Sequence, residues 1–550
     1  MSRGWIRRAL WALPVVVACI LPLPGLWQAA GPPMEEGFML VFPERLLHGD
    51  LPNRDFLHLY GPGSLWVLAA VYWIVGTSLG AERAVGYLQQ LGVVFGAWSL
   101  LRPWGPWVAA AGGTLAAVML IPPSGLTALA WIGAVALGLW SIRAAVEALE
   151  AEPGSRRRTR LLWTAGLLAG AALLYRLDLV LAMTASLVVA LWYLPGRDRR
   201  RLVVASMVGV SPYVAHLATA GVANVWRGMV IEPVFRLRGG RALPLPPNLH
   251  DFDGFLQRAG TLDAPPWPFP APPGPLQLSL WLVLLFAGCG LLLVAGRRCA
   301  REGRPRLLVM AAFATGLVPQ ALQRADSTHL AWVSCVTVAF LPAAVVELWP
   351  SRHLATDATT RAPRGRTLAA MLLPAVGLVV LVPFFTLRTY TEAVGQTFGY
   401  RHNALSMHYR GRVFRYARPD AVAAVNALLP VVDGLTDPGD RLFVGPGDLR
   451  LTPYSEAYLY YLLPDLTPAT RYIEMDPGVA NAAHSGLADE LRSADVAILS
   501  SIRDDWSEPN DSVLDGPNEP NVVLAQDFCL VDSYGVGLFG RGLFEVYRRC

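Results

Sequence analysis

Residues 33–63, PMEEGFMLVFPERLLHGDLPNRDFLHLYGPG, join two adjacent carboxylates to a stretch rich in His, Arg, Asp and aromatic residues. This stretch follows the first apolar segment of the chain and precedes many others. Charged residues beside apolar segments cost little where they reach water, so such a cluster is expected at a membrane surface. The side of the membrane that carries this stretch therefore decides how the rest of the chain is interpreted.

The composition is that of an integral membrane protein. Of 550 residues, 54% are hydrophobic and only 16% are charged, and long apolar runs fill most of residues 1–387. Residues 388–550 differ, because they hold 14 Arg against 22 Asp plus Glu, whereas the whole chain carries a net charge of +5. We expect a transmembrane domain over 1–387 and a separate domain over 388–550 that faces different surroundings, with no nucleic-acid partner.

Eleven apolar segments are expected to cross a hydrocarbon core of about 30 Å. They centre on residues 9–29, 84–101, 104–121, 124–145, 161–175, 179–195, 202–222, 277–296, 307–323, 329–349 and 367–387. A twelfth candidate, residues 62–80, carries Trp66, Tyr72 and Trp73, which suit a helix that lies in the membrane interface. We therefore predict about 11 transmembrane helices and an interfacial helix at 62–80.

Arginines set the orientation, because cytoplasmic loops carry an excess of basic residues. The basic connections are the N-terminus and residues 150–160, 196–201, 297–306 and 351–366. All of these basic connections lie on the same side of the membrane only if residues 62–80 do not cross it. This predicts a cytoplasmic N-terminus, an extracytoplasmic C-terminal domain, and a first segment that stays as an uncleaved anchor although it also has features of a signal peptide.

This topology gathers four polar patches at the outer face. They are a first outer loop over residues 30–83, the YRLD segment at 175–178, a Pro-rich outer loop over 223–276, and the QRADSTH segment at 323–329. Mixed charge within the patches indicates a site, although a salt bridge inside each patch is the structural alternative. Arg236, Arg238 and Arg241 of the Pro-rich loop either bind an anion or are solvated.

The C-terminal part predicts a small α/β domain, because short strand-like runs alternate with helix-like stretches. The strand-like runs are residues 441–445, 471–475 and 496–501, and the helix-like stretches include 420–434 and 480–494. Cys529 and Cys550 both lie here, so an extracytoplasmic position allows one disulfide between them. Two free thiols are the alternative.

The outer patches hold the groups that transfer of a phosphate-linked sugar needs. Arg176 and Arg324 carry planar guanidinium groups suited to phosphate oxygens, and His329 can add a donor or protonate a departing phosphate. A carboxylate opposite the leaving group can take the proton from an acceptor hydroxyl as it attacks the anomeric carbon. Glu35 and Glu36 supply such a base, and their mutual repulsion favours a raised pKa for one of them.

The opening stretch resembles the first outer loop of the GT-C class of polytopic glycosyltransferases, which includes protein O-mannosyltransferases and lipid A aminoarabinose transferases. In that class an acidic pair follows the first helix, and a G-x-x-P-x-R-D-F…Y-G-P-G type stretch often comes next. The matching residues are Glu35, Glu36, Gly49, Pro52, Arg54, Asp55, Phe56, Tyr60, Gly61, Pro62 and Gly63. The first acid of the pair is usually Asp, so either Glu could be the base here; the alignment favours Glu35, with Glu36 orienting the site or binding sugar.

The resemblance implies a mainly α membrane protein of GT-C type with a C-terminal extracytoplasmic α/β domain, in the cytoplasmic (inner) membrane of a bacterium. It implies a polyprenyl-phosphate sugar donor that is used at the outer face, usually with inversion at the anomeric carbon. The acceptor would be a glycan, a lipid or a protein, and arabinofuranose and mannose are both candidate sugars. The isoprenoid tail would stay among the membrane lipids while its phosphate meets the arginines at the helix ends.

Further substrate contacts are expected from polar residues of the same patches. They are Arg54, Asp55, His58, Tyr60, Asp178 and Asp326. An interfacial aromatic belt explains Tyr60 equally well. Some members of the GT-C class use a divalent cation and others use none; Glu35, Glu36 and Asp178 could hold one, but their spacing does not demand it.

Two other classes of function stay open. A transporter or flippase of a lipid-linked or envelope precursor would carry ionisable residues near the middle of its spans and show inverted repeats. Here the centres of the spans are nearly free of charge, and no repeat is evident. A non-catalytic scaffold for envelope assembly would differ from the enzyme only in activity.

Overall fold

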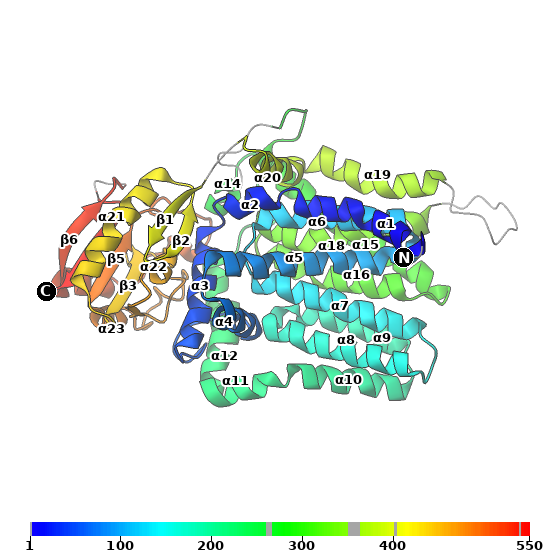
Figure 1. The fold of residues 1–550 in the computed structure, drawn as a ribbon, viewed down its shortest axis with the longest axis horizontal. Coiled ribbons are helices and arrows are strands. Elements are labelled where there is room, and N and C mark those ends of the chain that lie inside the picture. Colours follow the sequence, from blue (N-terminus) through cyan, green and yellow to red (C-terminus); the bar gives the residue numbers. More distant parts are fainter. Residues whose placement is uncertain (1–2, 260–266, 350–363, 401–403, 538–540) are drawn as a thin grey trace, which may run out of the picture.

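The structure has two parts, a bundle of long helices and a smaller α/β part packed against one end of it (Figure 1). It is a computed structural model that describes residues 3–259, 267–349, 364–400, 404–537 and 541–550. The predicted basic connection at 351–366 lies mostly outside these residues. The N-terminus lies at the far end of the bundle, and the C-terminus lies on the α/β part (Figure 1).

Seven helical segments of the described residues are long and apolar enough to cross a membrane. They are Trp11–Gln28, Leu79–Trp104, Pro106–Ser124, Ala130–Glu150, Gly196–Ala220, Gly274–Arg301 and Ser327–Leu348. An eighth is added if Thr367–Leu381 and Phe384–Thr397, which meet at 94°, form one broken span. The chain is therefore a multi-pass membrane protein, and the number of about 11 crossings stays a prediction.

The helical part contains the following elements in chain order. They are α1 (Arg3–Ile20), α2 (Leu23–Gln28), α3 (Pro33–Leu47), α4 (Gly63–Val75), α5 (Leu79–Leu101), η1 (Arg102–Trp104), α6 (Pro106–Ser124), α7 (Ala130–Glu150), α8 (Arg156–Tyr175), η2 (Leu177–Leu179), α9 (Val180–Trp192), α10 (Gly196–Val210), α11 (Pro212–Ala220), α12 (Val222–Trp226), the π-helix η3 (Arg227–Arg236), α13 (Leu237–Arg241), α14 (Phe255–Ala259), α15 (Gly274–Arg301), α16 (Arg306–Gly316), α17 (Val318–Gln323), α18 (Ser327–Leu348), α19 (Arg364–Leu381), the π-helix η4 (Phe384–Arg388) and α20 (Thr389–Thr397).

The apolar residues of each helix indicate whether it lies inside the bundle or at its periphery. The apolar window of α18 is 89% buried, because the helix is apolar on every side and packs against α6, α15 and α16. The segment Gly196–Ala220 is only 17% buried, so it lies at the periphery where its apolar side chains can meet lipid. The Pro-rich outer loop begins with α12, η3 and α13, so its first part is helical, although its prolines favour an extended chain.

The candidate interfacial helix is α4. It has 13 residues, which span about 20 Å and fall short of a hydrocarbon core of about 30 Å. α4 packs against α3, α5 and α8, and Tyr72 donates a hydrogen bond to the carbonyl of Met39 at 3.1 Å. This geometry agrees with a helix that does not cross.

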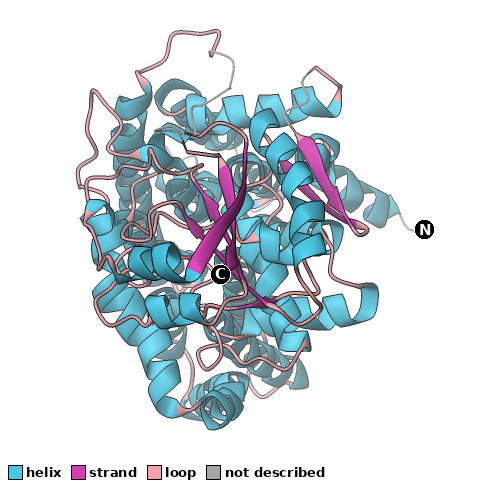
Figure 2. Ribbon diagram, turned by 90° about the vertical axis from the view of Figure 1, so that its left-hand side faces the viewer, coloured by secondary structure: helices cyan, strands magenta, loops and turns pink. Residues whose placement is uncertain are grey.

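The α/β part contains seven strands among the described residues. The elements are β1 (Leu405–Tyr409), β2 (Arg412–Tyr416), α21 (Pro419–Leu435), β3 (Arg441–Pro446), α22 (Tyr458–Leu462), β4 (Thr467–Pro468), α23 (Leu487–Arg492), β5 (Val496–Ser500), the 3-10 helix η5 (Asp511–Val513), α24 (Glu519–Asp527), β6 (Phe528–Tyr534) and β7 (Phe544–Arg549). The main sheet has the order β4-β3-β5-β7-β6, with β3 parallel to β4 and β5, and with β7 antiparallel to β5 and β6. Strands β1 and β2 form a separate antiparallel hairpin, and Figure 2 shows the strands among covering helices and loops.

Two of the strand predictions are confirmed and one is wrong. β3 and β5 match the predicted strands at 441–445 and 496–501, whereas residues 471–475 form turns. Met475 has a φ of 52°, in the left-handed region that a strand cannot contain, and its amide donates back to the carbonyl of Tyr472 at 3.1 Å. The apolar side chains of this segment are buried in a loop instead of a sheet. The predicted helix at 480–494 shortens to α23.

Helix α3 joins the two parts. Apolar residues of α3 and α4 share one buried cluster with residues of α21, α22 and the sheet. Gly37 of α3 lies so close to α22 that an added Cβ would come within 2.9 Å of the Tyr458 nitrogen, so only glycine fits there. Glu44 at the other end of α3 accepts two hydrogen bonds from Arg412, at 2.6 and 2.8 Å. α3 is therefore fixed between the bundle and the α/β part (Figure 1).

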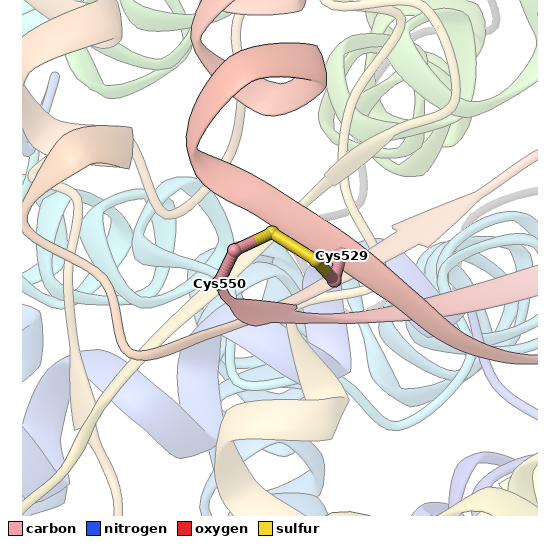
Figure 3. Close-up of a disulfide and its surroundings, with 2 residues drawn as sticks. All are labelled: Cys529 and Cys550. Carbon is pink, nitrogen blue, oxygen red and sulfur yellow. A yellow bond between two sulfur atoms is a disulfide. The ribbon is translucent and has the colours of Figure 1, made fainter.

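Cys529 of β6 and Cys550 after β7 form a disulfide (Figure 3). The two strands are neighbours in the sheet, with Cys529 opposite Arg548, which brings the two sulfur atoms together. Of the two alternatives that the sequence leaves open, the structure shows the disulfide. The remaining cysteines, Cys19, Cys289, Cys299 and Cys335, are free and buried.

Candidate active site

The acidic pair lies in the first turn of α3. This helix starts at Pro33, and proline is favoured there because the first turn leaves its backbone N–H groups unused. The same unused N–H groups favour negative charge, so the first turn is a suitable place for Glu35 and Glu36. Adjacent helical residues point about 100° apart, since a turn takes about 3.6 residues. The two carboxylates therefore face different surroundings.

Glu36 is held by Arg83 of α5. Arg83 Nε donates to Glu36 Oε1 at 2.7 Å, and Nη2 donates to Oε2 at 3.0 Å. The Glu36 side chain is fully buried and that of Arg83 is 2% exposed. Arg83 Nη1 also donates to the carbonyl of Trp27 at 2.7 Å. This two-bond pair ties α3 to α5 and leaves Glu36 little freedom to act on a substrate.

Glu35 has a different environment. Among the described residues, no side chain donates a hydrogen bond to its carboxylate, and the side chain is half-buried. Burial raises the pKa of Glu35, while its own backbone amide and the positive charges of Arg503, Arg241 and His329 oppose that rise. A carboxylate with a raised pKa, no fixed partner and cations around it is suited to accept a proton.

His329 is positioned by Asp326. Asp326 caps α18 by accepting from the amides of Thr328 and His329 at 3.0 and 2.9 Å, and its Oδ2 lies 2.9 Å from His329 Nδ1. Burial alone would raise the pKa of Asp326, but His329 and Arg324 hold it at about 2. The ring of His329 packs on Trp332 with centroids 4.7 Å apart. Since Nδ1 is turned to Asp326, Nε2 is the nitrogen left for a ligand.

Arg324 is engaged on every nitrogen. Nε donates to Asp326 Oδ2 at 3.0 Å, Nη1 donates to the carbonyl of Arg241 at 2.9 Å, and Nη2 donates to Glu508 Oε1. The side chain is 4% exposed. Arg324 thus joins the start of α18, the Pro-rich loop and the α/β part. Arg324 therefore stabilises the contact between these three elements, and a phosphate could bind to it only by sharing the N–H groups that make these hydrogen bonds.

Arg176 ends α8 and pairs with Asp178. Its Nε and Nη2 donate to the two carboxylate oxygens at 3.0 and 2.6 Å. The guanidinium group lies 3.9 Å from the ring centre of Tyr60, which places the YRLD segment against the first outer loop. Three predicted site residues therefore lie together, and the Asp178 side chain, 44% exposed, is open to solvent.

The other residues of the first outer loop serve the loop itself. Asp55 accepts from the amide of Leu51 at 2.8 Å and pairs with Arg54 at 2.7 Å. His58 is fully buried, with Phe42 on one side and Tyr60 on the other. Burial lowers the pKa of His58 to about 3, so its ring is neutral. The structure does not bring Arg54, Asp55 or His58 to Glu35, and His58 reaches the site only through Tyr60.

At the level of sequence, neither a protein-family model nor a curated protein matches the chain. Solved structures do match in fold. ArnT from Cupriavidus metallidurans, bound to undecaprenyl phosphate, aligns over 100% of this chain and 98% of its own with a TM-score of 0.53 at 14% identity. The oligosaccharyltransferase of Archaeoglobus fulgidus in its apo form aligns over 98% of this chain and 76% of its own, with a TM-score of 0.51 at 12% identity.

The chain has the GT-C fold. The archaeal AglB, in complex with an inhibitory peptide and a dolichol-phosphate, aligns as well, over 96% of this chain and 73% of its own, with a TM-score of 0.50 at 11% identity. Identities this low establish the architecture alone. The chemistry of this GT-C site has to be argued from its own residues.

The α/β part contributes residues that sequence analysis missed. Arg503 pairs with Glu456 at 3.2 Å and is one of the cations that act on Glu35. Glu474 and Asp476 face Arg241, which pairs with Asp476. No motif marks these residues, and residues 471–475 resemble a strand only because three of the five are apolar. The predicted anion-binding role of Arg241 competes with these two carboxylates.

The described part of this site offers no set of side chains suited to a divalent cation. Within the ranges that the structure describes, no three His, Cys, Asp or Glu side chains are grouped so that they could hold a metal ion. Of the three residues considered for one, Glu36 is paired with Arg83 and Asp178 is paired with Arg176. We therefore derive no step through a metal.

Proposed function

We propose that the protein is a membrane glycosyltransferase that moves a sugar from a polyprenyl-phosphate donor to a glycan, lipid or protein acceptor. The observation that carries this proposal is the environment of Glu35, a carboxylate without a side-chain partner among the described residues that is surrounded by Arg241, Arg503 and His329. The shared fold with ArnT, whose structure contains undecaprenyl phosphate, supports the class of donor. The cations supply the positive charge that a phosphate leaving group needs.

In this proposal Glu35 is the general base. It takes the proton of an acceptor hydroxyl while the hydroxyl oxygen bonds to the anomeric carbon and the bond from that carbon to the phosphate oxygen breaks. The products are the glycosylated acceptor and polyprenyl phosphate, and attack opposite the leaving group inverts the anomeric configuration. Glu36 positions the start of α3 through Arg83 and takes no proton.

The donor phosphate is assigned to the outer-end residues Arg176, Arg324 and His329. Their contacts give these three residues different roles. His329 Nε2 contacts the phosphate directly, Arg176 presents its charge beside Tyr60, and Arg324 acts mainly by fixing Asp326 and thereby His329. Asp178, Asp326 and Tyr60 then border the substrate, whereas Arg54, Asp55 and His58 shape the loop.

The proposed orientation in the membrane rests on the positions of the arginines and on the disulfide. The N-terminus is cytoplasmic and the α/β part is extracytoplasmic in a bacterial cytoplasmic membrane, in line with the positions of the arginines and with the Cys529–Cys550 disulfide, a bond typical of oxidising compartments. The sugar would be arabinofuranose, mannose or a related pentose or hexose.

Transfer can be tested with the full chain in lipid nanodiscs. Radiolabelled polyprenyl-phosphate mannose and polyprenyl-phosphate arabinofuranose are the donors, a membrane extract supplies acceptors, and release of polyprenyl phosphate is measured together with labelled product. We expect transfer by wild type and a loss of about 10²- to 10⁴-fold in Glu35→Gln. Equal transfer by the folded Glu35→Gln variant would remove the assigned base. Movement of intact labelled donor across a proteoliposome membrane, without sugar transfer, would favour the transporter class instead.

A further inference from the structure

Glu474 is a buried carboxylate that accepts no hydrogen bond from the described residues. It lies in the loop between β4 and α23, its side chain is 5% exposed, and its Oε1 has no hydrogen-bond partner. The cation paired with it is Arg241, whose Nη2 is 3.7 Å from Oε2, too far for a hydrogen bond. Arg241 forms its close ion pair with Asp476 instead, two residues after Glu474 in the chain. Glu474 therefore bears a burial cost that its protein contacts do not offset.

Glu490, a half-buried carboxylate of the same part, shows what a structural role looks like. Glu490 Oε2 accepts a hydrogen bond from Thr470 Oγ1 at 2.6 Å and another from the amide of Arg471 at 3.2 Å. These bonds fix the segment that leads into the Glu474 loop. These two hydrogen bonds offset the cost of removing the Glu490 carboxylate from water, whereas Glu474 accepts none from the described residues.

The backbone around Glu474 is held in an unfavourable conformation. Met475, the next residue, has a φ of 52°, and Tyr454, on which Arg241 stacks at 5.0 Å, has a φ of 88°. Residues with a side chain seldom adopt positive φ, and such positions concentrate at functional sites. Arg241 Nε is also buried without a hydrogen-bond partner among the described residues. Unsatisfied polar atoms and backbone strain thus occur together.

This cluster is linked to the candidate active site by Arg324, which donates from Nη1 to the carbonyl of Arg241 at 2.9 Å and from Nε to Asp326. The charged groups that act on Glu474 include Glu35 of α3 and Arg176, the residue after α8, as well as Asp476 and Arg241. A phosphate is not the expected ligand, because Glu474 and Asp476 would repel it. A hydroxyl group is suited to the position, since it can donate to a carboxylate and can also accept from Arg241 Nε.

We propose that Glu474 is a substrate-binding residue that hydrogen-bonds a hydroxyl group of a sugar ring, from the side of the site opposite the bundle. This inference rests on the proposed glycosyltransferase function and makes it more specific. The α/β part then selects the substrate as well as covering the site. The sugar ring belongs either to the donor or to a glycan acceptor, and both sources present the same hydroxyl chemistry.

The test compares Glu474→Met, Glu474→Gln and the matched control Glu490→Met in the full chain. Methionine has a similar length and removes the polar atoms. Without substrate, we expect Glu474→Met to melt at or above the wild-type temperature, because no hydrogen bond is lost, and Glu490→Met to melt lower, because Thr470 and Arg471 lose their acceptor. A drop in melting temperature for Glu474→Met as large as that for Glu490→Met would overturn the inference. This arm needs no activity and therefore stands even if the wild type transfers no sugar.

The kinetic arm separates the two sources of the ring. With polyprenyl-phosphate mannose or polyprenyl-phosphate arabinofuranose as donor, Glu474→Met should raise KM about tenfold for whichever substrate Glu474 holds. A raised donor KM identifies the donor sugar, and a raised acceptor KM with an unchanged donor KM identifies the acceptor. Glu474→Gln, which keeps a hydrogen-bonding group, should recover most of the loss, and Glu490→Met should stay within about twofold of wild type per folded molecule. Unchanged KM values for both substrates in Glu474→Met would overturn the inference.

Discussion

Arg83 holds Glu36 through two hydrogen bonds, of 2.7 and 3.0 Å, inside the protein. Glu35, the preceding residue, has no such partner among the described residues. One arginine thus separates the roles of two adjacent carboxylates. It fixes Glu36 to the bundle and leaves Glu35 without a side-chain partner among the described residues.

Glu36→Gln should destabilise the protein. Removing one member of a buried ion pair leaves the other charge uncompensated, which costs about 3–5 kcal/mol. The expected result is a lower melting temperature in nanodiscs, and any loss of transfer should follow the loss of folded protein. The double variant Glu36→Met/Arg83→Met removes both charges and should recover much of the stability. A Glu36→Gln protein as stable as wild type but inactive would instead make Glu36 the base.

The pH dependence of transfer should report the pKa of Glu35. A base must be deprotonated, so activity should rise with pH through a midpoint above 4.5, the ordinary value, because burial raises this pKa. Arg503 favours the deprotonated form. Replacing the pair as Arg503→Gln/Glu456→Gln removes that positive charge without leaving Glu456 unpaired, so the acidic limb should move to higher pH. The measurement is kcat against pH.

Arg492→Gln is the control for this shift, because Arg492 lies on the exposed surface of α23, 45% accessible, and pairs with Asp489. Its profile should match wild type. An acidic limb that moves to lower pH in the double variant, or that moves equally in the control, would contradict the assignment of Glu35.

Asp326 should act through His329. Asp326→Asn keeps a residue that can cap α18 but replaces the carboxylate that faces His329 Nδ1. We expect Asp326→Asn and His329→Ala each to raise the donor KM, and the double variant to be no worse than His329→Ala alone. Steady-state kinetics at saturating acceptor measure this. Effects that multiply in the double variant would show that the two residues act independently.

The disulfide offers a check on orientation. Opening the bond between Cys529 and Cys550, 21 residues apart, should cost about 3 kcal/mol by loop entropy. In intact cells, a membrane-impermeant thiol reagent should label these cysteines only after reduction, since the four others are buried. Cys529→Ser/Cys550→Ser is the control and should not label. Labelling without reduction would mean that the bond does not form in the cell.

Much of the fold can be predicted from sequence because membrane helices need long apolar runs and arginines mark their cytoplasmic ends. The sheet is harder. β3 and β5 are short buried strands that their apolar runs identify, whereas residues 471–475 contain three apolar residues but form turns. Apolar residues indicate burial, and a loop packed on both sides is buried as fully as a strand.

The site can be predicted only in part. Adjacent carboxylates after the first span indicate Glu35 and Glu36, yet the choice between them depends on Arg83, 47 positions further along. Arg503 and Glu474 lie beyond residue 470, on a different part of the fold. Nothing local to them signals a role, because their role comes from the packing of the α/β part on α3.

The packing of Gly37 against Tyr458 has a consequence for protein engineering. A chimera that exchanges the α/β part of this protein for that of another would place a foreign backbone against α3 and tilt Glu35. A successful graft must transplant residues 33–63 and 404–550 as one block. The boundary between interchangeable modules therefore runs through the end of the helical bundle that contacts the α/β part rather than along the linker after α20.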